Sequence, residues 1–117
     1  FFINKYSDNI SRSDVIFICV GTPPKKNGES NLNFVDQVTK EISKKIKGYT
    51  VIVSKSTVPV GTSRRIEKIL KRVRSTKTFD VVSNPEFLRE GSALEDFTKP
   101  DKIIIGCRTT KAEKILK

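Results

Sequence analysis

The sequence contains no histidine and only two cysteines among its 117 residues. Without histidine, and without closely spaced pairs of cysteines, it lacks the ligand sets that hold zinc in proteins, so we expect no metal site. Cys19 and Cys107 stand within or beside apolar runs. This placement favours reduced thiols in the core of a cytoplasmic protein over a disulfide framework. A buried thiol in mid-strand is inert, so we do not expect Cys19 to be a nucleophile.

Long apolar runs are absent as well. No run approaches the roughly 20 residues that a membrane-spanning helix needs, so we expect no membrane partner. The chain starts at Phe1 inside an apolar run, with neither a methionine nor a basic leader. We therefore expect no signal peptide, a cytoplasmic location, and a fragment of a longer polypeptide. The length suits one domain with a single core.

Acidic residues are outnumbered by basic ones, 13 to 23, which gives a formal net charge of +10. Such a charge raises nucleic acid as a partner. The basic residues, however, fall mostly on the polar faces of two predicted helices, and no aromatic residues interleave with them to stack bases. We interpret them as a solvated surface and expect no nucleic acid to bind.

Short apolar runs alternate with amphipathic segments along the chain. Strands are predicted at residues 15–20, 50–53, 79–82 and 102–105, after a possible strand tail at 1–3. Helices are predicted at residues 7–12, 33–47, 62–73, 93–97 and 109–117. Strands that alternate with helices of this length imply right-handed βαβ crossovers. The expected fold class is therefore α/β, with a parallel, Rossmann-like sheet of about four strands.

Polar residues and prolines follow three of the predicted strands. The three segments are Gly-Thr-Pro at 21–23, Ser-Thr-Val-Pro at 56–59 and Asn-Pro-Glu-Phe-Leu-Arg-Glu-Gly at 84–91. In a parallel sheet such segments emerge along one edge, which is where ligands bind in open α/β sheets. Glycine at position 21 permits close approach of a ligand, and the hydroxyl of Thr57 can both donate and accept a hydrogen bond. We interpret this edge as a binding site.

The wider motifs resemble the UDP-glucose/GDP-mannose dehydrogenase family, and within it the UDP-glucose 6-dehydrogenases. The resemblance rests on Val-Gly-Thr-Pro-Pro at 20–24, Lys-Ser-Thr-Val-Pro-Val-Gly-Thr at 55–62, Ser-Asn-Pro-Glu-Phe-Leu-Arg-Glu-Gly-Ser-Ala-Leu at 83–94 and Lys-Pro-Asp-Lys-Ile-Ile-Ile-Gly at 99–106. It covers nearly the whole chain, with the motifs in order. It implies an NAD-dependent enzyme that oxidises the C6 alcohol of a nucleotide sugar to a carboxylate, with UDP-glucose as the first candidate.

The resemblance also assigns roles to individual residues. Gly21 and Thr22 would contact NAD, and Thr57 would lie near the nicotinamide and the reacting carbon. Glu86 would perform acid–base work on the water that hydrolyses a thioester intermediate, as suits a carboxylate shielded from water by cofactor and sugar. Glu90 would lie between substrate and cofactor. The residues that would touch the sugar nucleotide are Phe87, Leu88 and Arg89.

By the same resemblance, residues 1–117 are the second half of an NAD-binding domain. The glycine-rich fingerprint that binds pyrophosphate would precede Phe1, and the catalytic cysteine and lysine would follow Lys117. We therefore expect the isolated chain neither to bind NAD tightly nor to turn over. We also expect a homo-oligomer, to which the sheet edge left open by the missing strands would contribute by self-pairing.

Other interpretations of the sequence stay open. GDP-mannose 6-dehydrogenase shares the motif at 84–90, whereas N-acetylmannosamine relatives usually carry a different Pro-Glu motif. A basic nucleic-acid-binding α/β module would show steeply salt-dependent binding, but it leaves the three proline-containing segments unexplained. In a purely structural interpretation, Glu86 caps the start of a helix and Thr57 provides hydrogen bonds to the backbone at the end of a strand. A scaffold that has lost its activity is the last alternative.

Overall fold

The computed structural model describes residues 7–117. Its elements follow one another as a short helix, a strand and then two helix–strand units, before two further short helices. The strands are β1 (Val15–Ile18), β2 (Thr50–Ser54) and β3 (Phe79–Ser83). The helices are α1 (Ser7–Ile10), α2 (Asn33–Lys45), α3 (Thr62–Lys71), α4 (Ala93–Thr98) and α5 (Thr110–Leu116). The strand tail expected at residues 1–3 lies outside the described part of the chain.

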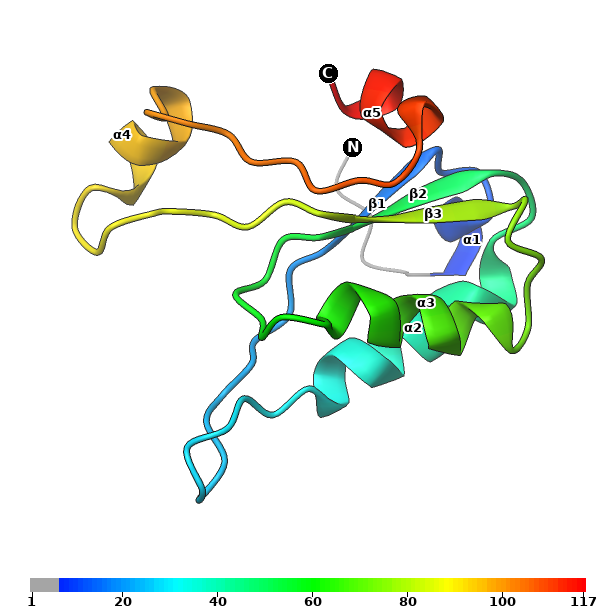
Figure 1. The fold of residues 1–117 in the computed structure, drawn as a ribbon, viewed down its shortest axis with the longest axis horizontal. Helices are drawn as coiled ribbons and strands as arrows, with labels where there is room; N and C mark the ends of the chain where they lie inside the picture. The colour runs from blue at the N-terminus through cyan, green and yellow to red at the C-terminus, as the bar shows by residue number, and fades with distance from the viewer. Residues whose placement is uncertain (1–6) are drawn as a thin grey trace.

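The three strands form one parallel sheet in the order β1-β2-β3. All five residues of β2 are buried, because this strand has a neighbour on each side and a layer on each face. Helices α2 and α3 cover one face, and α5 lies over the other (Figure 1). The predicted α/β architecture with a parallel sheet is therefore confirmed, and the alternation of apolar runs with amphipathic helices accounts for it.

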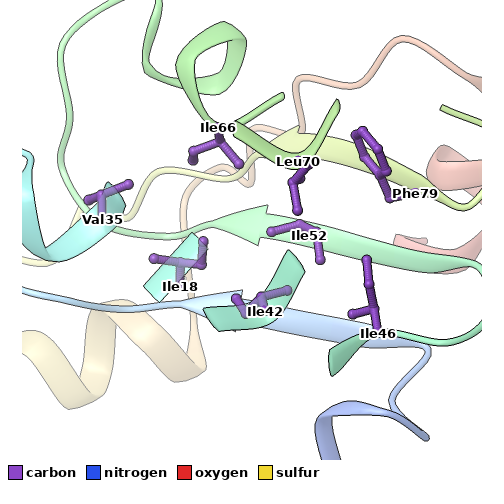
Figure 2. Packing of buried hydrophobic residues seen from close by; sticks show 8 residues of the cluster. All are labelled: Ile18, Val35, Ile42, Ile46, Ile52, Ile66, Leu70 and Phe79. Atoms are coloured by element: carbon purple, nitrogen blue, oxygen red, sulfur yellow. The ribbon is translucent and has the colours of Figure 1, made fainter. Parts of the chain in front are cut away.

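The main core lies between the sheet and helices α2 and α3 (Figure 2). Ile52 at the centre of β2 meets Ile42 of α2 and Leu70 of α3, all of them fully or almost fully buried. Burying a side chain of this size contributes roughly 1.5–3 kcal/mol relative to leaving it in water. Helix α3 is shorter than the helix predicted at residues 62–73, so Val73 lies beyond its end and is 54% exposed.

The prediction of a fourth strand at residues 102–105 is wrong for the described part of the chain, which contains three strands. This segment returns antiparallel to β3 and meets it in a single bridge, with reciprocal backbone hydrogen bonds between Ser83 and Gly106 of 2.9 and 2.7 Å. Just beyond that pair, the amide of Asn84 donates to the carbonyl of Ile104. A side-chain hydrogen bond therefore replaces the next backbone hydrogen bond that a continued β-ladder would form here. Ile103 stays 69% exposed because no layer covers it.

The first strand also differs from the prediction. It ends at Ile18, so Cys19 is exposed beyond the strand and is not the buried mid-strand thiol that we expected. Phe17 is 53% exposed, although the apolar run predicted burial on both faces. Within the described residues β1 pairs with β2 alone, and α5 is too short to cover the whole of its face of the sheet. None of the helices within residues 7–117 combines the length and the hydrophobicity that a membrane-spanning segment requires.

Helix α5 is held on the sheet by a polar cluster at its start. The hydroxyl of Tyr49 donates to Asp80 at 2.5 Å, and Thr109 donates to the same carboxylate oxygen at 2.8 Å. The Thr109 hydroxyl also accepts the backbone N–H of Ala112 and so caps the helix. The ammonium of Lys111 lies 3.4 Å from the centre of the Tyr49 ring. Burial, then the hydrogen bond to Asp80, raises the pKa of Tyr49 to about 12.

Truncation of the core should lower stability sharply. We expect Leu70→Ala to reduce the free energy of unfolding by about 2–5 kcal/mol, because it removes buried methyl groups and leaves a cavity against Ile52. Urea unfolding followed by circular dichroism measures this. Val60→Ala is the matched control, since Val60 is fully exposed and should change little. Equal losses in the two variants would contradict this account of the core.

The Tyr49 phenol should make stability depend on pH in the alkaline range. Its pKa is raised from 10.0 to about 12 in the folded state, so its contribution is complete below pH 10 and disappears as the pH rises through about 12. The unfolding free energy of the wild type should therefore approach that of Tyr49→Phe over this interval. Denaturant titrations of both proteins at a series of pH values check it. A difference that stays constant with pH would show that the phenol is not held as described.

Candidate functional site

All three strands point the same way, so the segments that follow them leave the sheet along one edge (Figure 1). Residues 19–24 follow β1, residues 55–61 follow β2 and residues 84–91 follow β3. In each case the regular ladder stops within two residues of a polar or proline-containing motif. The common direction of the strands therefore gathers the candidate site residues on one side of the molecule.

Hydrogen bonds join the first two segments into one unit. The hydroxyl of Ser56 donates to the carbonyl of Val20 at 2.7 Å, and the backbone N–H of Lys55 donates to Ile18 at 3.0 Å. The hydroxyl of Thr22 donates to the backbone carbonyl of Thr57 at 2.8 Å. Thr22 thus fixes the backbone of Thr57, and within the described residues the Thr57 hydroxyl itself has no protein partner.

A pocket of about 340 Å³ lies where these segments meet the third one. It is lined by Cys19, Val20, Gly21, Thr22, Lys55, Ser56, Thr57 and Glu86. A Cβ at position 21 would have nothing within 4 Å and would project into open space, so glycine leaves room there for a ligand. The pocket therefore brings together four of the predicted site residues, Gly21, Thr22, Thr57 and Glu86, although they lie far apart in the sequence.

A second pocket of about 370 Å³ adjoins the first and shares Lys55 and Glu86 with it. Its lining contains the predicted substrate residues Phe87, Leu88 and Arg89, together with part of α4 and of residues 100–103. Phe87 is 50% exposed, and the ammonium of Lys102 lies 5.2 Å from the centre of its ring. This pocket combines apolar surface with charged groups of both signs, which suits a ligand with a ring and an anionic part.

Arg89 is held by Asp96 of α4. The Asp96 carboxylate accepts the backbone N–H of Arg89 at 2.8 Å and three hydrogen bonds from its guanidinium, two from Nε at 3.1 and 3.3 Å and one from Nη2 at 2.6 Å. These hydrogen bonds lower the pKa of Asp96 to about 2. Arg89 and Asp96 both line the larger pocket, so the charge of this guanidinium is balanced within the pocket wall.

The positions of Glu90 and Glu86 in the chain are also defined. Glu90 lines neither of the two pockets and lies in an exposed turn. Residues 84–89 form no helix, and the next helix is preceded by Ser92 as its N-cap, so Glu86 does not cap a helix start. Among the described residues no cluster of three metal-ligating side chains occurs.

Sequence reasoning missed the contact between Lys55 and Asn84. The ammonium of Lys55 donates to the side-chain oxygen of Asn84 at 3.3 Å, and this links the second and third segments directly. Lys55 immediately follows the completely buried β2 and Asn84 immediately follows β3, and these positions at strand ends were a signal that could have singled them out. Cys19 also lines the smaller pocket. It does so because β1 ends at Ile18, two residues before the end of the predicted strand at 15–20.

The fold and the position of the site define a class of protein. A parallel sheet with helices on both faces, and with adjacent pockets at the carboxyl ends of its strands, is the arrangement of dinucleotide-binding α/β domains. The comparisons with known proteins specify the family. The model of the UDP-glucose/GDP-mannose dehydrogenase family, NAD binding domain, matches residues 1–117.

Individual relatives agree with this match. The chain is 49% identical over 98 residues to the UDP-glucose 6-dehydrogenase of Rhizobium meliloti (strain 1021), which covers 83% of the chain and 22% of that protein. The solved structure of a UDP-glucose dehydrogenase from the archaeon Pyrobaculum islandicum has a TM-score of 0.83 and 40% identity, over 92% of this chain and 26% of that one. GDP-mannose dehydrogenase from Pseudomonas aeruginosa, in a ternary complex, has a TM-score of 0.83 and 35% identity, with the same coverage.

The chain therefore belongs to the UDP-glucose/GDP-mannose dehydrogenase family and corresponds to its NAD-binding domain. The resemblance seen in the motifs and the Rossmann-like class are both confirmed. The chain spans about a quarter of the length of these relatives.

The Arg89–Asp96 ion pair should fix the wall of the larger pocket. We expect Asp96→Asn to speed amide hydrogen exchange in residues 89–96 at neutral pH, because the loop loses its charged acceptor. Global stability should change little, since the pair is at the surface. The lowered pKa of Asp96 means that the carboxylate contributes above about pH 4 and loses its effect as the pH falls through about 2.

Hydrogen exchange followed by NMR measures the effect, with Glu41→Gln on the exposed face of α2 as the matched control. Unchanged exchange in the Asp96 variant would mean that the ion pair does not hold the loop.

Proposed function

We propose that this chain supplies part of the active site of an NAD-dependent nucleotide-sugar 6-dehydrogenase that oxidises the C6 alcohol of UDP-glucose to the carboxylate of UDP-glucuronate. The supporting observation is the pair of adjacent pockets at one sheet edge, with Glu86 in the lining of both. In this proposal a glycine-rich half of the domain precedes the chain, and a domain with the nucleophilic cysteine follows it.

The smaller pocket is the proposed cofactor end. Its residues fit one end of a dinucleotide, because Gly21 leaves open space and the lining offers hydroxyls and backbone groups. NAD accepts the hydride when it is bound. The chain's part is to position the reaction: Gly21 allows close approach, and Thr22 holds the backbone of Thr57. The hydroxyl of Thr57, unpaired with other described groups, is then available to orient the alcohol or a water molecule.

The larger pocket is the proposed sugar-nucleotide end. Phe87 and Leu88 provide apolar surface, and Arg89 contributes through its backbone and stem because Asp96 holds its charge. Glu90 follows directly and is proposed to lie between substrate and cofactor once both are bound. Oxidation at C6 removes a hydride and a proton, and the proton needs an acceptor that reaches both pockets. Glu86 is the carboxylate in that place, and the same group can activate the water of the hydrolytic step.

GDP-mannose is the alternative substrate. The GDP-mannose dehydrogenase structure resembles this chain as closely in fold as the UDP-glucose dehydrogenase structure does, with TM-scores of 0.83 for both. The higher sequence identity, 40% against 35%, favours UDP-glucose. Assays of the complete polypeptide with both nucleotide sugars distinguish the two, since the physiological substrate should have the larger kcat/KM.

Assembly and location belong to the same proposal. We propose a homo-oligomer. In the isolated chain the outer edge of β1 has no partner strand within the described residues, so self-pairing at this edge is one route to association. We propose a cytoplasmic enzyme without nucleic-acid partners, because soluble nucleotide sugars and NAD are its substrates.

Substitutions of the two proposed catalytic residues test the function. In the complete polypeptide we expect Glu86→Gln to lower kcat about 10²–10⁴-fold, because the amide cannot accept the proton. Thr57→Val should also lower kcat, by the loss of an orienting hydroxyl. NADH formation is followed by absorbance, and Glu41→Gln serves as the control. If the Glu86 variant kept the wild-type kcat, Glu86 would not be the acid–base group, and if the wild type oxidised no nucleotide sugar, the function itself would be wrong.

A further inference from the structure

Lys55 occupies a position that its own strand determines. It is the first residue after β2, the central and completely buried strand, and its backbone N–H is bonded to Ile18 at the end of β1. The Cα of Lys55 is therefore fixed by the core of the sheet. Its half-buried side chain lines both pockets, a property that it shares with Glu86 alone.

The ammonium of Lys55 holds the start of the third segment. It donates to the side-chain oxygen of Asn84 at 3.3 Å. The Asn84 amide donates to Ile104 at 2.9 Å, and the Asn84 backbone N–H donates to Ser54 at 3.0 Å. Asn84 is thus bound on three sides, two residues before Glu86. The direction in which the chain leaves β3, and with it the place of Glu86, depends on this arrangement.

The charges in the two pockets distinguish Lys55 from the other cations. In the larger pocket Arg89 is paired with Asp96, and Lys102 lies over the Phe87 ring. Lys55 has a neutral amide as its partner, so no carboxylate of the described residues neutralises it. In the smaller pocket the only charged side chains are Lys55 and Glu86. When ligands exclude water from such a site, an ammonium needs an opposite charge close by.

From this geometry we propose that Lys55 is a positioning residue for the proposed reaction: its ammonium holds Asn84 and attracts the carboxylate of Glu86, so that Glu86 stays at the boundary between the cofactor and sugar pockets. The inference rests on the proposed function. Lys55 acts through Glu86 and does not itself exchange a proton or form a bond with the substrate. Loss of its charge lets the carboxylate move away from the reacting carbon.

The test uses kinetics of the complete polypeptide with UDP-glucose and NAD. Lys55→Met keeps the aliphatic stem and removes the charge, and it should lower kcat about 10- to 100-fold, the size of effect that a misplaced catalytic group produces. The KM for NAD should change much less than kcat. Lys55→Arg, which keeps the charge and can reach Asn84, should recover most of the activity. The exposed Lys77, in the connection between α3 and β3, gives the control Lys77→Met.

A double variant separates positioning from a general structural effect. If Lys55 acts through Glu86, then Lys55→Met should cause no further loss of kcat in a protein that already carries Glu86→Gln. Losses that multiply would overturn the proposal, as would a Lys55→Met enzyme with the wild-type kcat. Should Lys55→Met not fold, as judged by thermal unfolding, Lys55→Gln takes its place with the same expected loss. If the wild type oxidises UDP-glucose and the Lys55→Met variant is fully active, this inference alone is refuted. If the wild type is inactive, the proposed function is refuted with it.

Discussion

Parallel pairing of a completely buried central strand is the constraint on which the rest of the structure depends. β2 has a hydrogen-bonded neighbour on each side and a covering layer on each face, so none of its residues reaches water. Since β1 and β3 run in the same direction as β2, their following segments must leave the sheet at the same edge. The site is a consequence of that direction. No single segment forms it, and each would be an ordinary turn alone.

The polar contacts at this edge follow a consistent pattern. Hydroxyls and amides from one segment bond to the backbone of the next, as Thr22 does to Thr57 and Ser56 to Val20. Side chains that tie backbones together leave the functional groups of other residues free for ligands. The carboxylate of Glu86 and the hydroxyl of Thr57, both from residues of the pocket lining, have no hydrogen-bond partner among the described residues. The division between residues that hold the loops and residues that face the pockets is what preorganisation of a site requires.

Much of the lining of the two pockets could be predicted from sequence, because the lining residues stand at fixed offsets from the ends of strands. Gly21, Thr22, Thr57 and Glu86 line one pocket, and Phe87, Leu88 and Arg89 line the other. Glu90, to which the resemblance assigns a place between substrate and cofactor, lies in an exposed turn and lines neither pocket. Lys55 and Asn84 were missed because their contact crosses 29 residues, and no local pattern reports such a contact. The fourth strand was wrong for a related reason: the run at 102–105 is apolar enough, yet a ladder needs a partner along its whole length.

The sequence by itself determined the α/β class, the order of the elements as far as β3 and the family, since apolar periodicity and motif spacing are properties of the chain alone. Tertiary structure decided where strands end, which thiol is exposed and which cation reaches the site. The sequence predicts that Cys19 is buried in the core, but Cys19 is exposed and lines a pocket because β1 ends at Ile18. The physical reason is that burial and pairing depend on what packs against a segment, and that information resides in residues distant along the chain.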